Sequence, residues 1–121
     1  MNIGKHYIVE LNDITNDCFE NLLNKSNFNF FSELIESDLK DNGMNIISKQ
    51  VHHFNEENGA FTLLFLLSES HLSMHSWPEY NYLALDIFTC GNCDSVKIID
   101  KIIQFINPGK YHIQEIHRGP L

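Results

Sequence analysis

Two segments with helical spacing of apolar residues are separated by a block of strand-like segments, and this order constrains the fold most. Patterns typical of strands, rich in β-branched and aromatic residues, cover residues 5–12, 45–54, 60–67, 82–89 and 111–117. Because three strands follow one another between the helices, the β-α-β-β-β-α-β order differs from the regular alternation of parallel α/β folds. The order predicts an α+β fold: a two-layer α/β sandwich whose antiparallel sheet carries the helices on one face.

Each predicted helix has an apolar face and recognisable ends. In the first helix, apolar side chains recur at spacings of three and four, after capping residues at 16–17 and before Gly43; they are Phe31, Leu34, Ile35 and Leu39. In the second helix, Asp94 or Ser95 is the cap, and Asn-Pro-Gly at 107–109 ends it. No linker or repeat interrupts these patterns, so we expect residues 1–121 to form a single domain.

The charge balance and the apolar runs exclude several partners. Sixteen acidic residues face eight basic ones, for a formal net charge of −8, and Arg118 is the only arginine. Nucleic-acid-binding proteins carry clustered positive charge, so no nucleic acid is expected. The longest apolar run, residues 61–67, is too short to span a membrane, and residues 1–6 lack the order of a secretory signal. Three cysteines cannot all pair, so a secreted protein held together by disulfides is not expected. Together these features predict a soluble, cytoplasmic protein without a membrane partner.

Chemically reactive side chains concentrate in residues 67–79, directly after the most apolar strand. This segment holds four serines, two histidines and a carboxylate near each end. A rigid strand would deliver these groups to a fixed place. With Cys90 brought near by strand pairing, serine, histidine and cysteine could support nucleophilic chemistry with histidine as the base. Composition alone leaves open the simpler interpretation that these polar strand ends face solvent.

Two blocks of this region resemble a known family. Residues 68–80, Ser-Glu-Ser-His-Leu-Ser-Met-His-Ser-Trp-Pro-Glu-Tyr, and residues 84–91, Ala-Leu-Asp-Ile-Phe-Thr-Cys-Gly, closely resemble the prokaryotic, pyruvoyl-dependent S-adenosylmethionine decarboxylase proenzymes. Weaker similarity extends to Gly-Lys-His at 4–6 and to the closing strand at 115–119. The resemblance therefore covers most of the chain.

The resemblance implies a precursor that cuts itself between Glu69 and Ser70, into residues 1–69 (beta chain) and 70–121 (alpha chain). Ser70 Oγ would attack the Glu69 carbonyl carbon, and β-elimination followed by hydrolysis would leave a covalent pyruvoyl group at residue 70. His75 matches the family's proton acceptor for processing, and histidine titrates near working pH. Thr62 stands where the family usually carries a serine that assists processing; it keeps the hydroxyl and adds a methyl group.

The resemblance also implies the reaction of the processed enzyme. The substrate amine would form a Schiff base with the pyruvoyl ketone, carbon dioxide would leave, and Cys90 matches the residue that returns a proton. Trp77 and Phe54 would sandwich the adenine of S-adenosylmethionine, and the Glu79 carboxylate would bind its ribose. The product would supply the aminopropyl group for spermidine and other polyamines. A homodimer is implied as well, and it fits the modest core of a chain this short.

Three departures from the family pattern, and several alternative interpretations, stay open at this level. Thr62, Leu83 (in place of the usual alanine) and a turn at 55–59 longer than usual leave room for a related decarboxylase of arginine or ornithine. A homologue that binds a partner or nucleoside without processing is a separate alternative, and it would need none of Ser70, His75 and Cys90. Leu83 either narrows the pocket or fills the core. The CxxC pair of Cys90 and Cys93 lacks further ligands for zinc, so no metal is expected. His71 either orients the scissile bond or makes a structural hydrogen bond.

Overall fold

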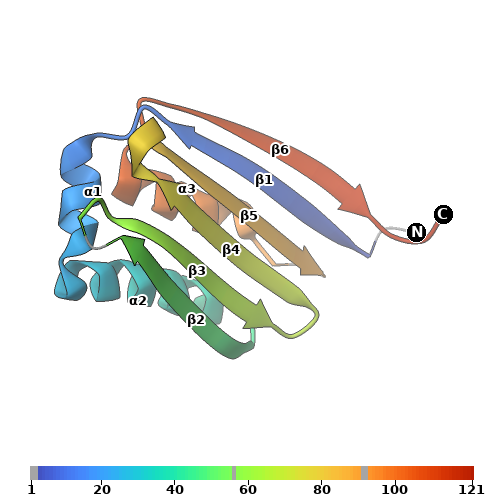
Figure 1. Cartoon of the computed structure of the whole chain (residues 1–121). Helices are drawn as coiled ribbons and strands as arrows, with labels where there is room; N and C mark the ends of the chain where they lie inside the picture. Colours follow the sequence, from blue (N-terminus) through green and yellow to red (C-terminus); the bar gives the residue numbers. More distant parts are fainter. Residues whose placement is uncertain (1–2, 56, 91–92) are drawn as a thin grey trace.

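The computed structural model describes residues 3–55, 57–90 and 93–121, apart from the side chain of Asn55. Six strands form one antiparallel sheet: β1 (Gly4–Asn12), β2 (Ile46–Asn55), β3 (Ala60–Leu67), β4 (Ser70–Trp77), β5 (Tyr82–Cys90) and β6 (Lys110–Arg118), in the order β2-β3-β4-β5-β1-β6. The helices are α1 (Asn16–Leu23), α2 (Lys25–Asp41) and α3 (Ser95–Ile106), with a 3₁₀ turn η1 (Pro78–Tyr80). Figure 1 shows α2 and α3 behind one face of the sheet and α1 at its end. The α+β class is confirmed.

The structure adds one strand and one helix boundary to the expected order. Residues 70–77, for which the sequence predicted a reactive segment and no strand, form the strand β4. Their burial alternates, with Leu72 and Met74 facing the core, and this period of two is typical of a half-buried strand. The first predicted helix is divided at Asn24, whose side chain accepts a hydrogen bond from the Asn27 N–H and caps α2. Thr15, rather than residues 16–17, caps α1.

The core lies between the sheet and the helices. Alternate residues of the central strands are buried against it, among them Leu63, Phe65, Leu72, Met74, Leu85 and Ile87, and they meet Phe31, Ile35, Ile98 and Ile102 from α2 and α3. Leu83 is fully buried in this layer, so it fills the core. No helix of the described residues is long and apolar enough to cross a membrane.

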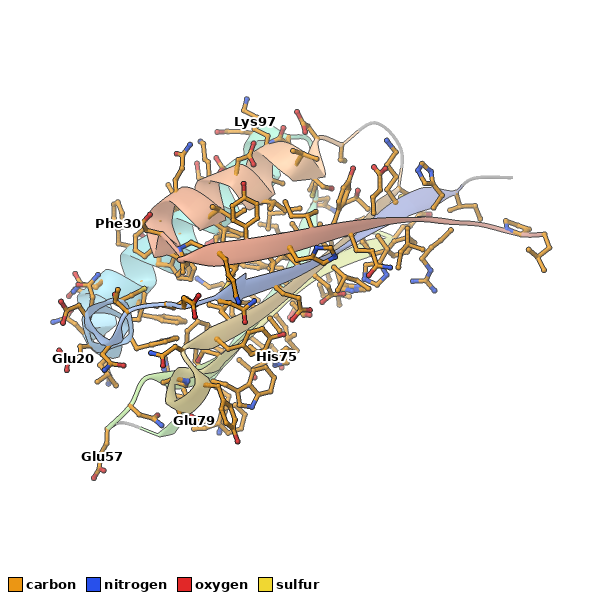
Figure 2. All side chains as sticks on the ribbon, turned by 90° about the horizontal axis from the view of Figure 1, so that it is seen from above. Glu20, Phe30, Glu57, His75, Glu79 and Lys97 are labelled. Atoms are coloured by element: carbon orange, nitrogen blue, oxygen red, sulfur yellow. The ribbon has the colours of Figure 1, made fainter. Side chains whose placement is uncertain are left out.

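The other face of the sheet, which we call the open face, carries no helix of the described residues. Its outward side chains include Thr62, His75, Trp77 and Asp86, which alternate with the core residues of β3, β4 and β5. Figure 2 shows His75 and Glu79 projecting on the side of the sheet opposite Lys97 of α3. Leu64 and Leu66 are 41% and 52% exposed on this face. His71, Ser73, His75 and Trp77 of β4 therefore stand on a layer that the helices leave uncovered.

A buried hydroxyl ties the β2–β3 turn to β4. Ser76 is 6% exposed; its Oγ accepts a hydrogen bond from the Phe61 N–H at 2.8 Å and donates to the Gly59 carbonyl at 3.1 Å. Gly59 has φ of +82°, a conformation that glycine adopts without strain. The turn is thereby held against the end of β4 that carries His75 and Trp77.

Ser76→Ala is expected to lower the free energy of unfolding by about 1–3 kcal/mol, because it leaves the buried Phe61 N–H without its partner. Urea unfolding followed by circular dichroism measures the change. Ser26→Ala, at an exposed position of α2, is the control and should change stability by less than about 0.5 kcal/mol. An equal effect of the two variants would contradict the anchoring role of Ser76.

Candidate active site

The predicted site residues fall into two clusters at opposite ends of β4. Ser70 is the first residue of this strand and His75 the sixth. At about 3.3 Å per residue, the five intervening steps separate them by about 17 Å. Strands β3 and β5, paired on either side, supply the neighbours of each end.

The first cluster lies at the β3–β4 hairpin. Ser70 Oγ is 3.9 Å from Cys90 Sγ, and the Cys90 thiol lies 3.5 Å from Glu69 Oε2, to which it donates. Cys90 ends β5, so the antiparallel pairing of β4 and β5 brings a cysteine twenty positions away to the hairpin. The structure thus brings together three residues selected from the sequence: Glu69, Ser70 and Cys90.

Glu69 holds a strained backbone conformation. Its φ is +61°, in the left-handed region, at the last position of the two-residue turn that links the Leu67–Ser70 pair. Turn positions with positive φ favour glycine or asparagine, because a side chain there costs about 1–2 kcal/mol. The peptide bond that follows Glu69, which the resemblance identifies as scissile, therefore adjoins a strained residue.

The second cluster joins Thr62 and His75 across two strands. Thr62 and His75 are register partners on β3 and β4, and Thr62 Oγ1 lies 2.9 Å from His75 Nδ1. The hydroxyl that stands in place of the family's usual serine therefore reaches the imidazole. This contact orients the ring on the open face, with its other nitrogen, Nε2, left for a further partner.

A cleft of about 470 Å³ opens beside this pair. Its lining includes Phe54, Ala60, Thr62, His75, Trp77 and Glu79, from strands β2, β3 and β4 and from η1. Phe54 is the extra residue of a β-bulge, because His53 pairs with Phe61 and Asn55 with Ala60. Bulges re-aim side chains next to functional sites. The volume is in the range that holds a small-molecule ligand.

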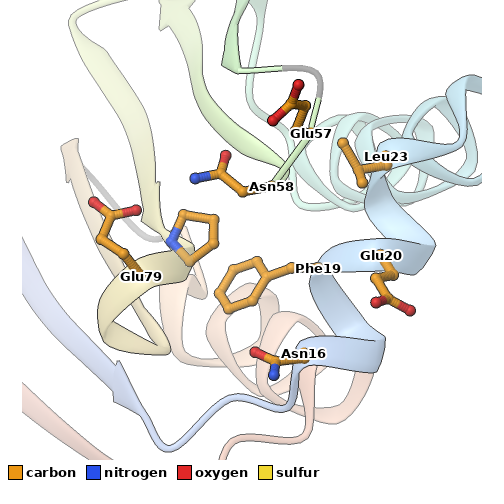
Figure 3. Close-up of a pocket in the computed structure, with 8 residues that line it drawn as sticks. Asn16, Phe19, Glu20, Leu23, Glu57, Asn58 and Glu79 are labelled. Atoms are coloured by element: carbon orange, nitrogen blue, oxygen red, sulfur yellow. The ribbon is translucent and has the colours of Figure 1, made fainter.

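A second cleft, of about 300 Å³, shares Glu79 with the first. Figure 3 shows Asn16, Phe19, Glu20 and Leu23 of α1 on one side of it, facing Asn58 and Glu79. Pro78 and Glu57 complete the lining. Glu79 thus stands at the border of two hollows, where its exposed carboxylate is accessible to a ligand.

A polar network that sequence reasoning did not assemble crosses the centre of the open face. His6 Nε2 and His71 Nε2 lie 2.7 and 2.8 Å from the same oxygen of Asp86, Oδ2, and Ser73 donates to Oδ1. His71 therefore makes the structural hydrogen bond that was one of its two expected roles. The only signal in the sequence was the alternation of Asp86 with apolar neighbours, which places it on the outward face.

The same three residues, His6, His71 and Asp86, offer ligand atoms within 4.8 Å of one another. Arg118 Nη1 lies 3.4 Å from His6 Nδ1, and a guanidinium only donates, so His6 Nδ1 accepts and Nε2 carries the proton. That proton points to Asp86. Hydrogen bonding thus accounts for this group, whereas a metal would need both Nε2 atoms unprotonated.

Comparisons with known proteins decide the family. The family model for S-adenosylmethionine decarboxylase matches residues 5–119. The chain belongs to the S-adenosylmethionine decarboxylase family. A Methanococcus aeolicus protein named S-adenosylmethionine decarboxylase proenzyme is 33% identical over 120 residues, covering 98% of this chain and 96% of the relative. A Pyrococcus horikoshii protein of the same name is 34% identical over 118 residues, covering 97% and 79%.

A solved structure agrees with this assignment. The crystal structure of the adenosylmethionine decarboxylase from Aquifex aeolicus VF5 superposes with a TM-score of 0.78 at 26% identity, covering 99% of this chain and 93% of that one. Within this S-adenosylmethionine decarboxylase family member, Ser70, Glu69 and Cys90 meet at one end of β4, and Thr62, His75, Trp77, Glu79 and Phe54 gather at the other. The CxxC link at 91–92 lies outside the described residues.

Asp86→Asn is expected to destabilise the fold in a pH-dependent way. Partial burial raises the pKa of Asp86, but hydrogen bonds from Ser73, His71 and His6 outweigh it, so the pKa lies below its usual value. The unfolded chain then binds the proton more readily, so this stabilisation is present above about pH 4 and disappears as pH falls through the lowered pKa.

The measurement is urea unfolding of wild type and Asp86→Asn at pH 7 and pH 3. At pH 7 the variant should lose about 1–3 kcal/mol, and the difference should shrink at pH 3. Asp100→Asn, exposed on α3, is the control. A difference that is the same at both pH values would show that the Asp86 charge is not what stabilises the network.

Proposed function

We propose that this chain is a precursor that cuts itself between Glu69 and Ser70 and then decarboxylates S-adenosylmethionine, supplying the aminopropyl donor for polyamine synthesis. Family membership supports the reaction class. The observation that carries the proposal is the contact of Ser70 Oγ with Cys90 Sγ, 3.9 Å apart, directly after the strained Glu69.

Self-processing uses atoms of the chain alone, plus one water. Ser70 Oγ attacks the carbonyl carbon of Glu69, the C–N bond breaks, and an ester replaces the amide. A base removes the Ser70 Cα proton, and the Cα–H electrons expel the Glu69 carboxylate from Cβ, leaving dehydroalanine. After tautomerisation, water replaces the nitrogen as ammonia and leaves a ketone. The left-handed φ of Glu69 favours the first step, because an ester turn is less constrained than an amide turn.

The base assigned to the second step is His75, and one copy of the chain cannot deliver it. His75 lies on the same straight strand as Ser70, about 17 Å away. A second copy, packed on the open face and related by a two-fold axis near the middle of β4, would place its His75 end over the Ser70 end of the first. The exposed Leu64 and Leu66 on this face support such burial. We therefore propose a homodimer in which each site uses both copies.

The residues around position 70 fit a pyruvoyl group formed there. A pyruvoyl ketone withdraws the electrons released when a carboxylate leaves as carbon dioxide. The Cys90 thiol, 3.9 Å from the Ser70 oxygen, is placed to return the proton to the substrate carbon. Half-burial of Ser70 and Cys90 limits the access of water, which would compete as proton donor.

Substrate binding is assigned to the cleft beside His75. Phe54 and Trp77 are 65% and 39% exposed in one copy and offer aromatic surface on its two sides, and Glu79 offers a carboxylate to ribose hydroxyls. The negative charge of Glu79 also suits a sulfonium cation. Because these groups suit a nucleoside, S-adenosylmethionine is favoured over arginine or ornithine.

Mass spectrometry under denaturing conditions is expected to find two fragments, residues 1–69 and 70–121. The mass of the second fragment should correspond to a pyruvoyl group, instead of serine, at its first position. Ser70→Ala removes the nucleophile and should remain one chain of 14.1 kDa. Purified wild type should release carbon dioxide from S-adenosylmethionine and not from arginine or ornithine. A wild-type chain that stays intact would overturn the proposed processing.

Co-expression of two inactive variants tests the shared site. Ser70→Ala carries an intact His75, and His75→Ala carries an intact Ser70, so a mixed dimer contains one complete processing site. Each variant alone should stay uncut, whereas co-expression should yield cleavage confined to the His75→Ala chain. Differently sized tags identify the cut chain. No cleavage in the mixture, with mixed dimers shown by pull-down, would contradict a base supplied by the second copy.

Replacing Glu69 with glycine should slow processing, because glycine adopts positive φ without strain and stabilises the uncut turn. Glu69→Ala keeps the strain and loses the side chain, so it is the matched control. The expected cleavage rate of Glu69→Gly is about 5-fold below that of Glu69→Ala, as about 1 kcal/mol of strain implies. Gel densitometry after refolding measures both rates. Equal rates would show that backbone strain does not assist the cut.

A further inference from the structure

Four neighbouring strands carry a row of side chains across the open face at the cleft. Trp77 on β4 pairs with Tyr82 on β5. Two positions beyond the Thr62–His75 pair, Ala60 on β3 comes opposite Trp77. On the other side of β3, Ala60 pairs with Asn55 of β2, the residue next to Phe54. The row therefore reads Phe54, Ala60, Trp77, Tyr82 from the edge of the sheet inward.

The spacing between strands determines which of these side chains touch and which leave a gap. Neighbouring strands lie about 4.8 Å apart, so rings on adjacent strands touch, while rings two strands apart leave about 9.6 Å between their backbones. Trp77 and Tyr82 are adjacent, and their rings stack with centroids 5.6 Å apart at 25°. Phe54 and Trp77 are two strands apart. Two rings with a planar group between them need about 7 Å, at about 3.5 Å per contact, so the spacing suits one inserted ring.

The side chain between Phe54 and Trp77 decides whether this slot is open. It is Ala60, whose single methyl lies on the floor of the cleft. A larger side chain there would fill the space from below. On the far side of Trp77, Tyr82 prevents the indole from tilting away from the slot, and the Tyr82 hydroxyl is itself bonded to the Glu10 carboxylate of β1.

We propose that Ala60 and Tyr82 determine specificity for a planar aromatic base: Ala60 keeps the slot open, and Tyr82, held by Glu10, positions Trp77 as its wall. This inference rests on the proposed function, since it assigns the slot to the adenine of the nucleoside substrate. Tyr82 is a positioning residue, because it acts through Trp77. Processing is assigned to Ser70 and His75 rather than to Ala60 or Tyr82, so variants at these two positions that leave His75 in place should still be cut.

The experiment compares Tyr82→Leu, Tyr82→Phe, Ala60→Ser and Ala60→Leu with wild type, and uses Tyr111→Leu on β6 as the matched control. Three quantities are measured: the fraction of cut chain, kcat and KM for S-adenosylmethionine, and quenching of tryptophan fluorescence by 5′-methylthioadenosine. Trp77 is the only tryptophan, so the fluorescence reports on this wall alone.

Tyr82→Leu should raise KM by about 2- to 12-fold, the range for losing one aromatic pair, with kcat within about twofold. Tyr82→Phe keeps the ring and loses the Glu10 bond, so a smaller rise in KM is expected, with lower anisotropy of Trp77 emission. Ala60→Leu should raise KM more than Ala60→Ser and abolish quenching. All variants should be cut like wild type, and Tyr111→Leu should match wild type throughout.

Cut variants whose KM and quenching equal those of wild type would overturn the slot and leave the proposed function standing. A wild type that is neither cut nor active would instead overturn the proposed function. If Tyr82→Leu does not fold, Tyr82→Phe and the Ala60 pair still decide the matter. A fall in kcat and in cleavage without a change in KM would assign Tyr82 a purely structural role and also overturn the inference.

Discussion

The antiparallel pairing of β4 with β3 and β5 is the constraint on which the rest of the structure depends. It sets Thr62 opposite His75, brings Cys90 to Ser70, and places Trp77 against Tyr82. A shift of one residue would move all these side chains to the wrong face, because successive residues of a strand point in opposite directions. The buried Leu72 and Met74 hold the register, since only this alignment keeps them in the core. Apolar burial therefore sets the geometry of the polar site.

Much of the fold and of the site could be predicted because the signals were local. Ala60–Leu67 was recognised as a strand from its apolar run, and α3 from its spacing and its Asp94 cap. Strand β4 was not, because Ser70, His71, Ser73 and His75 made its residues look like a reactive loop, although Leu72 and Met74 alternate with them. In this segment the polar, reactive side chains mask the period of two that Leu72 and Met74 carry.

The parts that could not be predicted depend on contacts between distant residues. His6 and Asp86 are eighty positions apart, and no local pattern in either segment predicts their hydrogen bond. The separation of Ser70 from His75 follows only once residues 70–77 are known to be extended. The bulge at Phe54 likewise depends on how β2 aligns with β3. A single sequence shows which side chains are present; the pairing of strands decides which of them meet.

The strand order has a consequence for a chain cut at the β3–β4 hairpin. Residues 1–69 would contribute β1, β2 and β3, and residues 70–121 would contribute β4, β5 and β6. In the sheet β1 lies between β5 and β6, so one piece is threaded between two strands of the other. The two pieces are joined by hydrogen bonds on both sides of β1, so they cannot dissociate unless these strand pairings break. Once unfolded, they would have to find each other as separate molecules, so a molecule that folded as one chain would regain its shape only by a bimolecular encounter.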